Sequence, residues 1–352
     1  RVSTGPVQRA MSKRGRDATT TEDAEVAATT ADKKPFSTLS VFTYQGPLCT
    51  HYVTAAQAAS ALPALLSAVF GSRQRHSVFS FTMNASGSFL VLDEALHREL
   101  FGGSGSERWS CIYIHESSPS RSGAEVSGSL SLLFNRLSCA QVPVLNVCTL
   151  RRNFLLVRSS LSNVALQTLR SALDGESPPS VPEAIIAGKP PTASRSGTTS
   201  GVRIELLRST LAIGSLSLAQ LKQCAHGLLQ TLFLGRRETD FVHFFEMGGE
   251  VSLAIGEGAL AELERAEPES AAALNEALKP SLSRGWRVLD VTAAAGCDGI
   301  GILSQVCLPL AKLPLMNFST LDHTFVLVPE AHLDSALEML APQFDVTREP
   351  LR

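Results

Sequence analysis

The sequence has few charged residues and no long apolar segment. Charged side chains make up 18 % of the 352 residues and aromatic side chains 6 %. No apolar run approaches the roughly 20 residues that a membrane-spanning helix needs. The 31 Lys and Arg residues nearly balance the 33 Asp and Glu residues, whereas nucleic-acid-binding proteins carry a basic surplus. We therefore expect neither a membrane nor a nucleic acid as a partner.

The sequence also lacks the motifs of common catalytic and metal sites. The seven cysteines include no C-x-x-C pair and no Cys/His cluster with zinc spacing. There is no H-E-x-x-H sequence, no G-x-S-x-G nucleophile turn and no G-x-x-x-x-G-K-[ST] phosphate loop. These absences predict that the protein is not an enzyme and uses no metal or cofactor. The cysteines are interpreted as reduced core thiols of a cytoplasmic protein.

Two segments lack apolar periodicity. Residues 1–35 include the small, polar and acidic stretch TTTEDAEVAATTAD, which is typical of a disordered tail. Residues 174–201 hold five of the 18 prolines together with many Ser, Thr and Gly, which predicts a flexible linker. The remaining chain divides into two parts of similar size on either side of this linker.

The two parts contain similar segments. VLNVCTLRRNFLLV spans residues 144–157 and LMNFSTLDHTFVLV spans residues 315–328. Aligned without a gap, their identical positions include Asn146 and Asn317, Thr149 and Thr320, Leu150 and Leu321, and Phe154 and Phe325. A Trp-led strand pattern precedes each segment, and an amphipathic helix pattern follows it. The similarity predicts an internal repeat.

Each quarter of the ordered chain has the pattern strand, helix, strand, tight turn, strand, helix. This order is typical of a ferredoxin-like βαββαβ sandwich of about 70 residues. We therefore predict an α+β fold of four tandem ferredoxin-like units, arranged as two pseudo-repeat halves. The predicted units span residues 36–108, 109–173, 202–284 and 285–352.

The repeated segments resemble ACT domains, the amino-acid-sensing modules of aspartokinases. The clearest matches are Gly301–Leu310, Ser319-Thr320 and Val328-Pro329-Glu330 in the last unit, and Val142–Arg158 in the second. The overall arrangement is similar to the CASTOR family, cytosolic arginine sensors upstream of TOR complex 1 that contain four such units. The resemblance implies a cytoplasmic, non-catalytic homodimer that binds an amino acid between the second and fourth units. It also implies a protein partner in nutrient signalling.

One loop of the last unit suits the carboxylate of an amino acid. Its glycines let the backbone approach a ligand closely, and the following helix presents unpaired N–H groups at its positive end. Asp298 could bind an α-ammonium group or cap the helix, and an ordinary strand-to-helix turn is the alternative. The candidate ligand-binding residues of this loop are Asp298, Gly299, Ile300, Gly301, Ile302 and Leu303.

The resemblance implies that the other wall of this pocket consists of Pro143, Val144, Thr320, Leu321 and Thr324. The arginine sensors have Ser at the position of Pro143 and Asp at the position of Thr324. A guanidinium is bound best by a carboxylate in bidentate geometry, which Thr324 cannot supply. We therefore expect a smaller or uncharged amino acid rather than arginine.

The partner-binding stretch that the family implies corresponds to Leu150, Arg151, Arg152 and Asn153. The acidic residue of the family is absent here and two positive charges are present, so an altered contact or a solvated hairpin turn is expected. Two alternatives to amino-acid sensing stay open. One is a scaffold that binds its partner without a ligand, and the other is an orphan regulatory subunit of an amino-acid biosynthetic enzyme.

Overall fold

The computed structural model describes residues 38–44, 46–71, 78–84, 87–102, 107–116, 123–149, 152–175, 201–234, 241–293 and 300–348. All of them belong to one unit, Pro35–Arg352. The predicted tail and residues 176–200 of the predicted linker lie outside the described residues.

The described part of the first half alternates strands and helices. Its elements are β1 (Leu39–Thr43), β2 (Leu48–Thr54), α1 (Ala58–Phe70), β3 (Phe79–Asn84), β4 (Gly87–Asp93), α2 (Glu94–Phe101), β5 (Arg108–Glu116), α3 (Gly123–Cys139), β6 (Val144–Cys148), β7 (Arg152–Arg158) and α4 (Ser162–Asp174). Asp93 begins α2 as a cap, because its carboxylate accepts a hydrogen bond from the Leu96 N–H at 2.7 Å.

The second half has a similar order of elements. They are β8 (Val202–Ser217), α5 (Leu218–Gln223), α6 (Ala225–Leu229), the π-helical turn η4 (Gln230–Leu234), β9 (Val242–Met247), β10 (Glu250–Gly256), α7 (Glu257–Ala266), α8 (Pro268–Leu278), β11 (Ser283–Ala293), α9 (Ile302–Cys307), β12 (Met316–Ser319), β13 (His323–Pro329), α10 (Leu333–Leu340) and β14 (Asp345–Arg348). Ser217 and Gln220 form a capping box at the start of α5. Among the described helices, none is long and apolar enough to cross a membrane.

The strands form one sheet that closes on itself. The order of hydrogen-bonded strands is β5-β2-β4-β3-β9-β10-β8-β11-β13-β12-β6-β7, and the pairing of β7 with β5 completes the ring. Neighbouring strands in this ring are antiparallel, and the closed barrel has 12 strands. Outside the ring, β1 pairs with β5 in antiparallel orientation and β14 pairs with β8 in parallel orientation.

The predicted fold class was wrong. The order strand, helix, strand, strand, helix, strand does occur along the chain, for example from β2 to β5. However, strands of the four predicted units are hydrogen-bonded to one another, through β3 with β9 and through β6 with β12. These pairings join edges that separate units would leave open. The closed barrel therefore replaces the four tandem ferredoxin-like ACT units in two repeat halves.

The closed sheet also overturns the description of the chain as an ACT-domain protein with an internal repeat. The two similar sequence segments form the β6–β7 and β12–β13 hairpins, which lie next to each other in the same ring. Two of the predicted unit boundaries, 108/109 and 284/285, fall inside β5 and β11.

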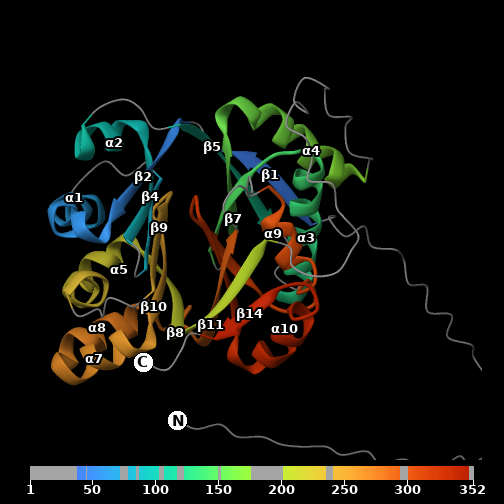
Figure 1. Ribbon diagram of the computed structural model, residues 1–352. Helices are drawn as coiled ribbons and strands as arrows, with labels where there is room; N and C mark the ends of the chain where they lie inside the picture. The colour runs from blue at the N-terminus through green and yellow to red at the C-terminus, as the bar shows by residue number, and fades with distance from the viewer. Residues whose placement is uncertain are drawn as a thin grey trace, which may run out of the picture. The chain divides into compact units, whose positions relative to one another are not determined.

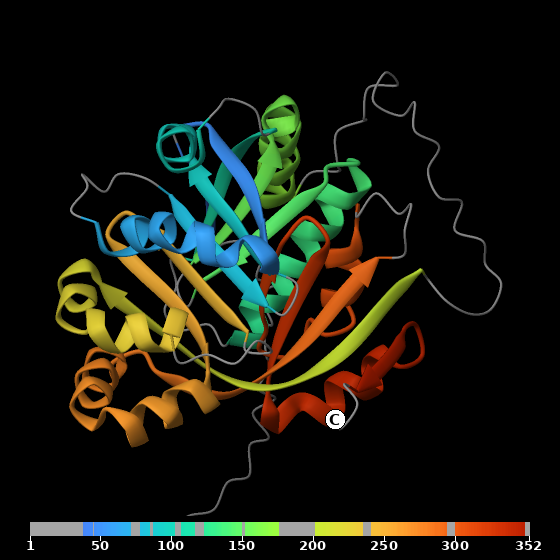
Figure 2. The same cartoon turned by 60° about the vertical axis from the view of Figure 1, so that its left-hand side comes forward.

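Two layers of helices cover the outer face of the barrel (Figure 1). One layer contains α1, α5, α7 and α8, and the other contains α3, α4, α9 and α10; the turned view in Figure 2 shows the same two groups. Each layer has its own apolar cluster against the sheet. A third cluster fills the barrel interior, where Phe154 packs on Phe245 and Phe241 packs on Phe325 with ring centroids 4.5 and 4.7 Å apart. Alternation along each strand thus places apolar residues on both faces of the sheet.

The contact between β6 and β12 is called the seam below, because it joins the two halves of the chain with little backbone pairing. Phe318 and Val147 form the one residue pair of this contact that the described residues show. Side chains reinforce it: the Asn146 amide donates to the Asn317 backbone oxygen at 3.3 Å and also to the Asn317 side-chain oxygen. Asn146 is fully buried. Buried amide bonds therefore supplement the short ladder of the seam.

We predict that Asn146→Ala destabilises the protein by about 1–3 kcal/mol, because it leaves buried acceptors of Asn317 without their donor. Asn317→Ala should have a similar effect, and the double variant should be less destabilised than the sum of the two. Urea unfolding measures all three, with Asn163→Ala on the exposed surface of α4 as the control. If the loss of stability in the double variant equals the sum of the two single losses, the direct contact between Asn146 and Asn317 is contradicted.

Candidate functional site

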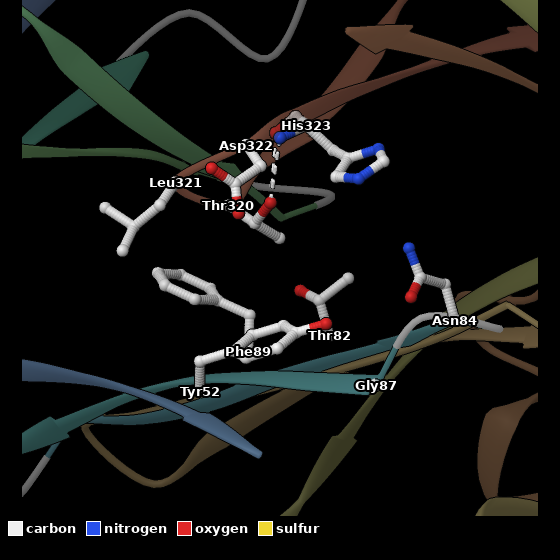
Figure 3. A pocket seen from close by; sticks show the side chains of 9 residues that line it. All are labelled: Tyr52, Thr82, Asn84, Gly87, Phe89, Thr320, Leu321, Asp322 and His323. Atoms are coloured by element: carbon white, nitrogen blue, oxygen red, sulfur yellow. Dashed lines mark hydrogen bonds between the residues drawn. The ribbon is translucent and has the colours of Figure 1, made fainter. Parts of the chain in front are cut away.

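A pocket of about 190 Å³ lies at the end of the barrel where β2 and β3 end and β4 and β13 begin. Its lining residues are Tyr52, Thr82, Asn84, Gly87, Phe89, Thr320, Leu321, Asp322 and His323. Figure 3 shows the side chains of β2, β3 and β4 on one side of this space and those of the β12–β13 turn on the other. The pocket therefore joins residues from both halves of the chain.

One wall of the pocket is a row of residues across four neighbouring strands. Tyr52 on β2 pairs with Phe89 on β4, Phe89 pairs with Thr82 on β3, and Thr82 pairs with His243 on β9. Directly paired residues share a face of the sheet, and Phe89 belongs to the apolar cluster inside the barrel. The row therefore faces the interior, and its polar members end at the pocket.

His243 lies deeper in the barrel than the pocket lining. It is 1 % exposed, its Nδ1 is 2.9 Å from the Thr82 hydroxyl oxygen, and its ring stacks on Phe318 with centroids 3.9 Å apart. Burial lowers the pKa of His243 to about 3, because a charged imidazolium has no water around it there. His243 is therefore neutral at physiological pH.

The opposite wall is the tight turn between β12 and β13. The Thr320 hydroxyl accepts a hydrogen bond from the His323 N–H at 3.0 Å, and the Thr320 N–H donates to the His323 carbonyl at 2.8 Å. These bonds close the turn and leave Leu321 and Asp322 exposed at its tip, with Leu321 55 % exposed. The turn therefore presents one apolar side chain and one carboxylate beside the pocket.

His323 is held by a carboxylate of the neighbouring strand. Its Nδ1 is 2.8 Å from Oδ1 of Asp290 on β11, and its ring is stacked with Phe325. The hydrogen bond with Asp290 raises the pKa of His323 above 6.5, although burial acts in the opposite direction. The imidazolium is thus favoured at the edge of the pocket.

The pocket suits a small polar ligand. Its volume of about 190 Å³ is below the range of drug-sized pockets. The lining supplies three hydroxyls, an amide, a carboxylate and an imidazole, together with apolar surface from Phe89 and Leu321. Among the described residues, no group of three or more His, Cys, Asp or Glu side chains could hold a metal ion.

The structure divides the predicted ligand-binding residues between two places. Val144, Gly301 and Leu303 line a separate cavity between α3, β6 and α9, with a volume of about 20 Å³. A space of this size holds about one water molecule and not an amino acid. Thr320 and Leu321 instead line the larger pocket.

The other predicted residues line neither space. Pro143, Ile300 and Ile302 are half-buried, and the Thr324 hydroxyl lies 3.5 Å from the Ser319 hydroxyl on β12. Asp298 and Gly299 lie outside the described residues.

The predicted partner-binding stretch is described only in part. Leu150 and Arg151 lie outside the described residues. The Arg152 guanidinium lies 6.0 Å from the centre of the Tyr113 ring, and Asn153 is buried on β7. Arg152 therefore makes a cation–π contact, while Asn153 is not presented to a partner.

Sequence reasoning did not associate Tyr52, Thr82, Asn84, Gly87 or Phe89 with a site. The available signal was the alternation along β3, where Ser80, Thr82 and Asn84 occupy one face and Phe79, Phe81 and Met83 the other. In an open sheet, a polar face is expected to be exposed to solvent. In a closed sheet, the same face can point into the interior.

The buried thiols are poor nucleophiles. Burial raises the pKa values of Cys111, Cys148 and Cys307 to about 12. Since the thiolate is the reactive form, these cysteines act as apolar core residues.

Comparisons with known proteins give no family. No family model matches the chain, and no curated protein matches it. Among solved structures, aspartate kinase from Synechocystis is similar at 12 % identity and a TM-score of 0.31, over 88 % of this chain and 56 % of the kinase. The chain thus spans about half the length of that enzyme.

Two smaller proteins are also similar. One from Agrobacterium tumefaciens has 16 % identity and a TM-score of 0.31, over 44 % of this chain and 98 % of that one. Another from Vibrio cholerae, described as a protein of unknown function and possible transport protein, has 17 % identity and a TM-score of 0.27, over 39 % of this chain and 91 % of that one. TM-scores this low carry no argument about function. None of these neighbours links the chain to the CASTOR family.

We predict that Gly87→Ala destabilises the protein by roughly 2–5 kcal/mol. Gly87 has φ +148°, and an added Cβ would lie 2.4 Å from the Val53 carbonyl oxygen. Gly102→Ala is the matched control, because Gly102 has φ +66° but open space around its Cα, so strain alone of about 1 kcal/mol is expected. Thermal unfolding compares the two, and equal losses would contradict the close packing at the pocket.

We also predict that the stability difference between the wild type and His323→Gln depends on pH. A raised pKa in the folded state means that the imidazolium contributes stability fully below pH 6.5, and that this contribution is lost as pH rises through the raised pKa. In urea unfolding from pH 5.5 to 9, the difference in free energy of unfolding between the wild type and His323→Gln should therefore decrease as the pH increases. Asp290→Asn should reduce this pH dependence, since Asp322 also raises the pKa of His323, whereas a stability difference that grows with pH would contradict the ion pair.

Proposed function

We propose that the chain is a non-catalytic regulatory protein that binds a small amino acid in the pocket at the end of the barrel. The observation that carries the proposal is the composition of the lining. A carboxylate on one wall faces a hydroxyl and an amide on the other wall, across a space of amino-acid size. A zwitterion needs both a carboxylate and donor groups within a few ångströms of each other.

The two walls divide the recognition between them. The Asp322 carboxylate on the turn suits an α-ammonium group, and the Thr82 hydroxyl and Asn84 amide on β3 suit a carboxylate. Phe89 and Leu321 supply apolar contacts for a short side chain. This division favours a small uncharged amino acid over arginine.

The position of the pocket supports regulation. A ligand there contacts β2–β4 of the first half and the β12–β13 turn of the second, and this turn directly follows β12 of the seam. Binding would therefore favour the arrangement in which the two halves are closed on each other. The size of that effect is limited by the difference in ligand affinity between the two arrangements.

The CASTOR resemblance of the sequence adds the expectation of a homodimer and of a protein partner in the TOR pathway. Both expectations rest on that resemblance alone.

A ligand-independent scaffold is the second candidate function. The observation that favours it is the cavity beside Val144 and Gly301, which at about 20 Å³ is too small for an amino acid at the place where the resemblance puts the ligand.

The test is thermal unfolding of the purified protein with each of the twenty amino acids at millimolar concentration. A ligand at 100 times its Kd adds about 2.7 kcal/mol to the free energy of unfolding, which corresponds to a shift of several degrees for a chain of this size. We expect one small amino acid to raise the midpoint. A flat panel would favour the scaffold.

Variants then locate the site. Asp322→Asn should weaken binding of the amino acid roughly tenfold or more, because it removes the carboxylate that pairs with the ammonium group. Asp334→Asn is the matched control, since Asp334 is exposed on α10 and does not line the pocket. Equal affinities of both variants and the wild type would mean that the amino acid binds elsewhere.

A further inference from the structure

The buried pair of Thr82 and His243 determines which kind of ligand group the pocket wall can bind. The pair is joined by a single hydrogen bond of 2.9 Å between the Thr82 hydroxyl oxygen and Nδ1 of His243. Nε2 of His243 is buried and has no hydrogen-bond partner among the described residues. Either atom of the pair could be the donor, and only when Nδ1 donates is the hydroxyl proton of Thr82 left for a ligand in the pocket.

A neutral imidazole carries one proton, so the two cases correspond to its two tautomers. In the first, Nδ1–H donates to the Thr82 oxygen, and the unprotonated Nε2 is a buried acceptor that receives no hydrogen bond. In the second, the Thr82 hydroxyl donates to Nδ1 and Nε2–H is buried without an acceptor. An orphaned buried N–H is rarer in proteins than an acceptor with an unused lone pair. The first tautomer is therefore favoured at His243.

This tautomer leaves the proton of the Thr82 hydroxyl unused. Thr82 lines the pocket and is 5 % exposed, and its bond with His243 then uses its oxygen only as an acceptor. The same wall carries the Asn84 amide one position further along the inward-facing row of β3, and Figure 3 shows Thr82 and Asn84 side by side facing the turn. The hydroxyl proton thus has an acceptor position inside the pocket.

We infer that His243 acts as a positioning residue that makes Thr82 a hydrogen-bond donor toward the pocket, so that the β3 wall favours a carboxylate over an ammonium group. This inference deepens the proposed function and rests on the same pocket. It assigns the orientation of the ligand: its carboxylate lies at Thr82, and its cationic end lies at Asp322 on the opposite turn.

In this arrangement, neutral hydrogen-bond donors bind the carboxylate of the ligand. A donor held by a buried neighbour is already oriented before the ligand arrives, so less side-chain freedom is lost on binding. A hydrogen bond to a charged group contributes more than one between neutral groups. Removing the Thr82 hydroxyl should therefore weaken carboxylate binding by roughly ten- to a hundredfold.

The first experiment reads the tautomer without any ligand. The full chain is labelled with ¹⁵N-histidine, and long-range ¹⁵N–¹H spectra assign the protonated nitrogen of each ring, with His243→Phe identifying the signals of His243. We expect Nδ1 to carry the proton from pH 5 to 8. Protonation on Nε2 would overturn the inference.

The second experiment compares propionate with propylammonium, which share an apolar chain and differ in the charged end. We expect propionate to shift the Thr82 methyl and His243 ring signals, and propylammonium to leave them unchanged at the same concentration. In the variants the response is followed at the His243 ring signals: Thr82→Val should lose the propionate response, and Thr82→Ser, which keeps the hydroxyl, should retain it. A response to propylammonium alone, no response to propionate, or retention in Thr82→Val would each overturn the inference.

These outcomes are separable from those of the proposed function. A flat amino-acid panel together with propionate binding would reject amino-acid sensing and leave the carboxylate wall in place. An amino acid that binds while His243 is protonated on Nε2 would reject the role of His243 alone.

Discussion

Closure of the sheet is the constraint on which the rest of the structure depends. Pairing of β5 with β7 completes a ring of strands, so the described strands of the ring have a partner on each side and present no open edge. Alternation then divides every strand into an outward face under the helices and an inward face. The inward aromatic residues, such as Phe154 and Phe245, fill the middle of the barrel. Polar inward residues such as Thr82 and Asn84 line the pocket at its end.

The local elements could be predicted from the sequence, but the closure could not. Period-two alternation shows which residues share a face, and the repeated hairpin segments indicated strands at 144–157 and 315–328 that the structure contains as β6–β7 and β12–β13. Alternation does not show which strands pair. The decisive contacts, Thr82 with His243 and Val147 with Phe318, join residues more than 160 positions apart. Pattern reasoning therefore produced four separate sandwiches instead of one ring.

The same limit explains which site residues were missed. Thr320 and Leu321 entered the prediction through a resemblance and do line the pocket, although with different neighbours from those expected. Thr82 and Asn84 alternate with buried apolar residues along β3, which shows that they share a polar face. In an open sheet such a face is expected to contact solvent, so the alternation did not indicate a pocket. Gly301 was chosen because glycine permits close backbone approach. In the structure Gly301 has φ +84°, a left-handed conformation that favours glycine, and an added Cβ would lie 2.5 Å from the Ser138 hydroxyl oxygen on α3, so backbone conformation and packing account for glycine at this position.

Buried contacts through His243 connect the pocket with the seam. Thr82 at the pocket is bonded to His243, and the His243 ring stacks on Phe318 with centroids 3.9 Å apart. Phe318 is also the β12 residue that pairs with Val147 of β6. A ligand that fixes Thr82 therefore restrains the imidazole against the residue at the seam. The seam has a shorter ladder than the β3–β9 contact between the halves, so this stacking adds side-chain packing where backbone pairing is sparse.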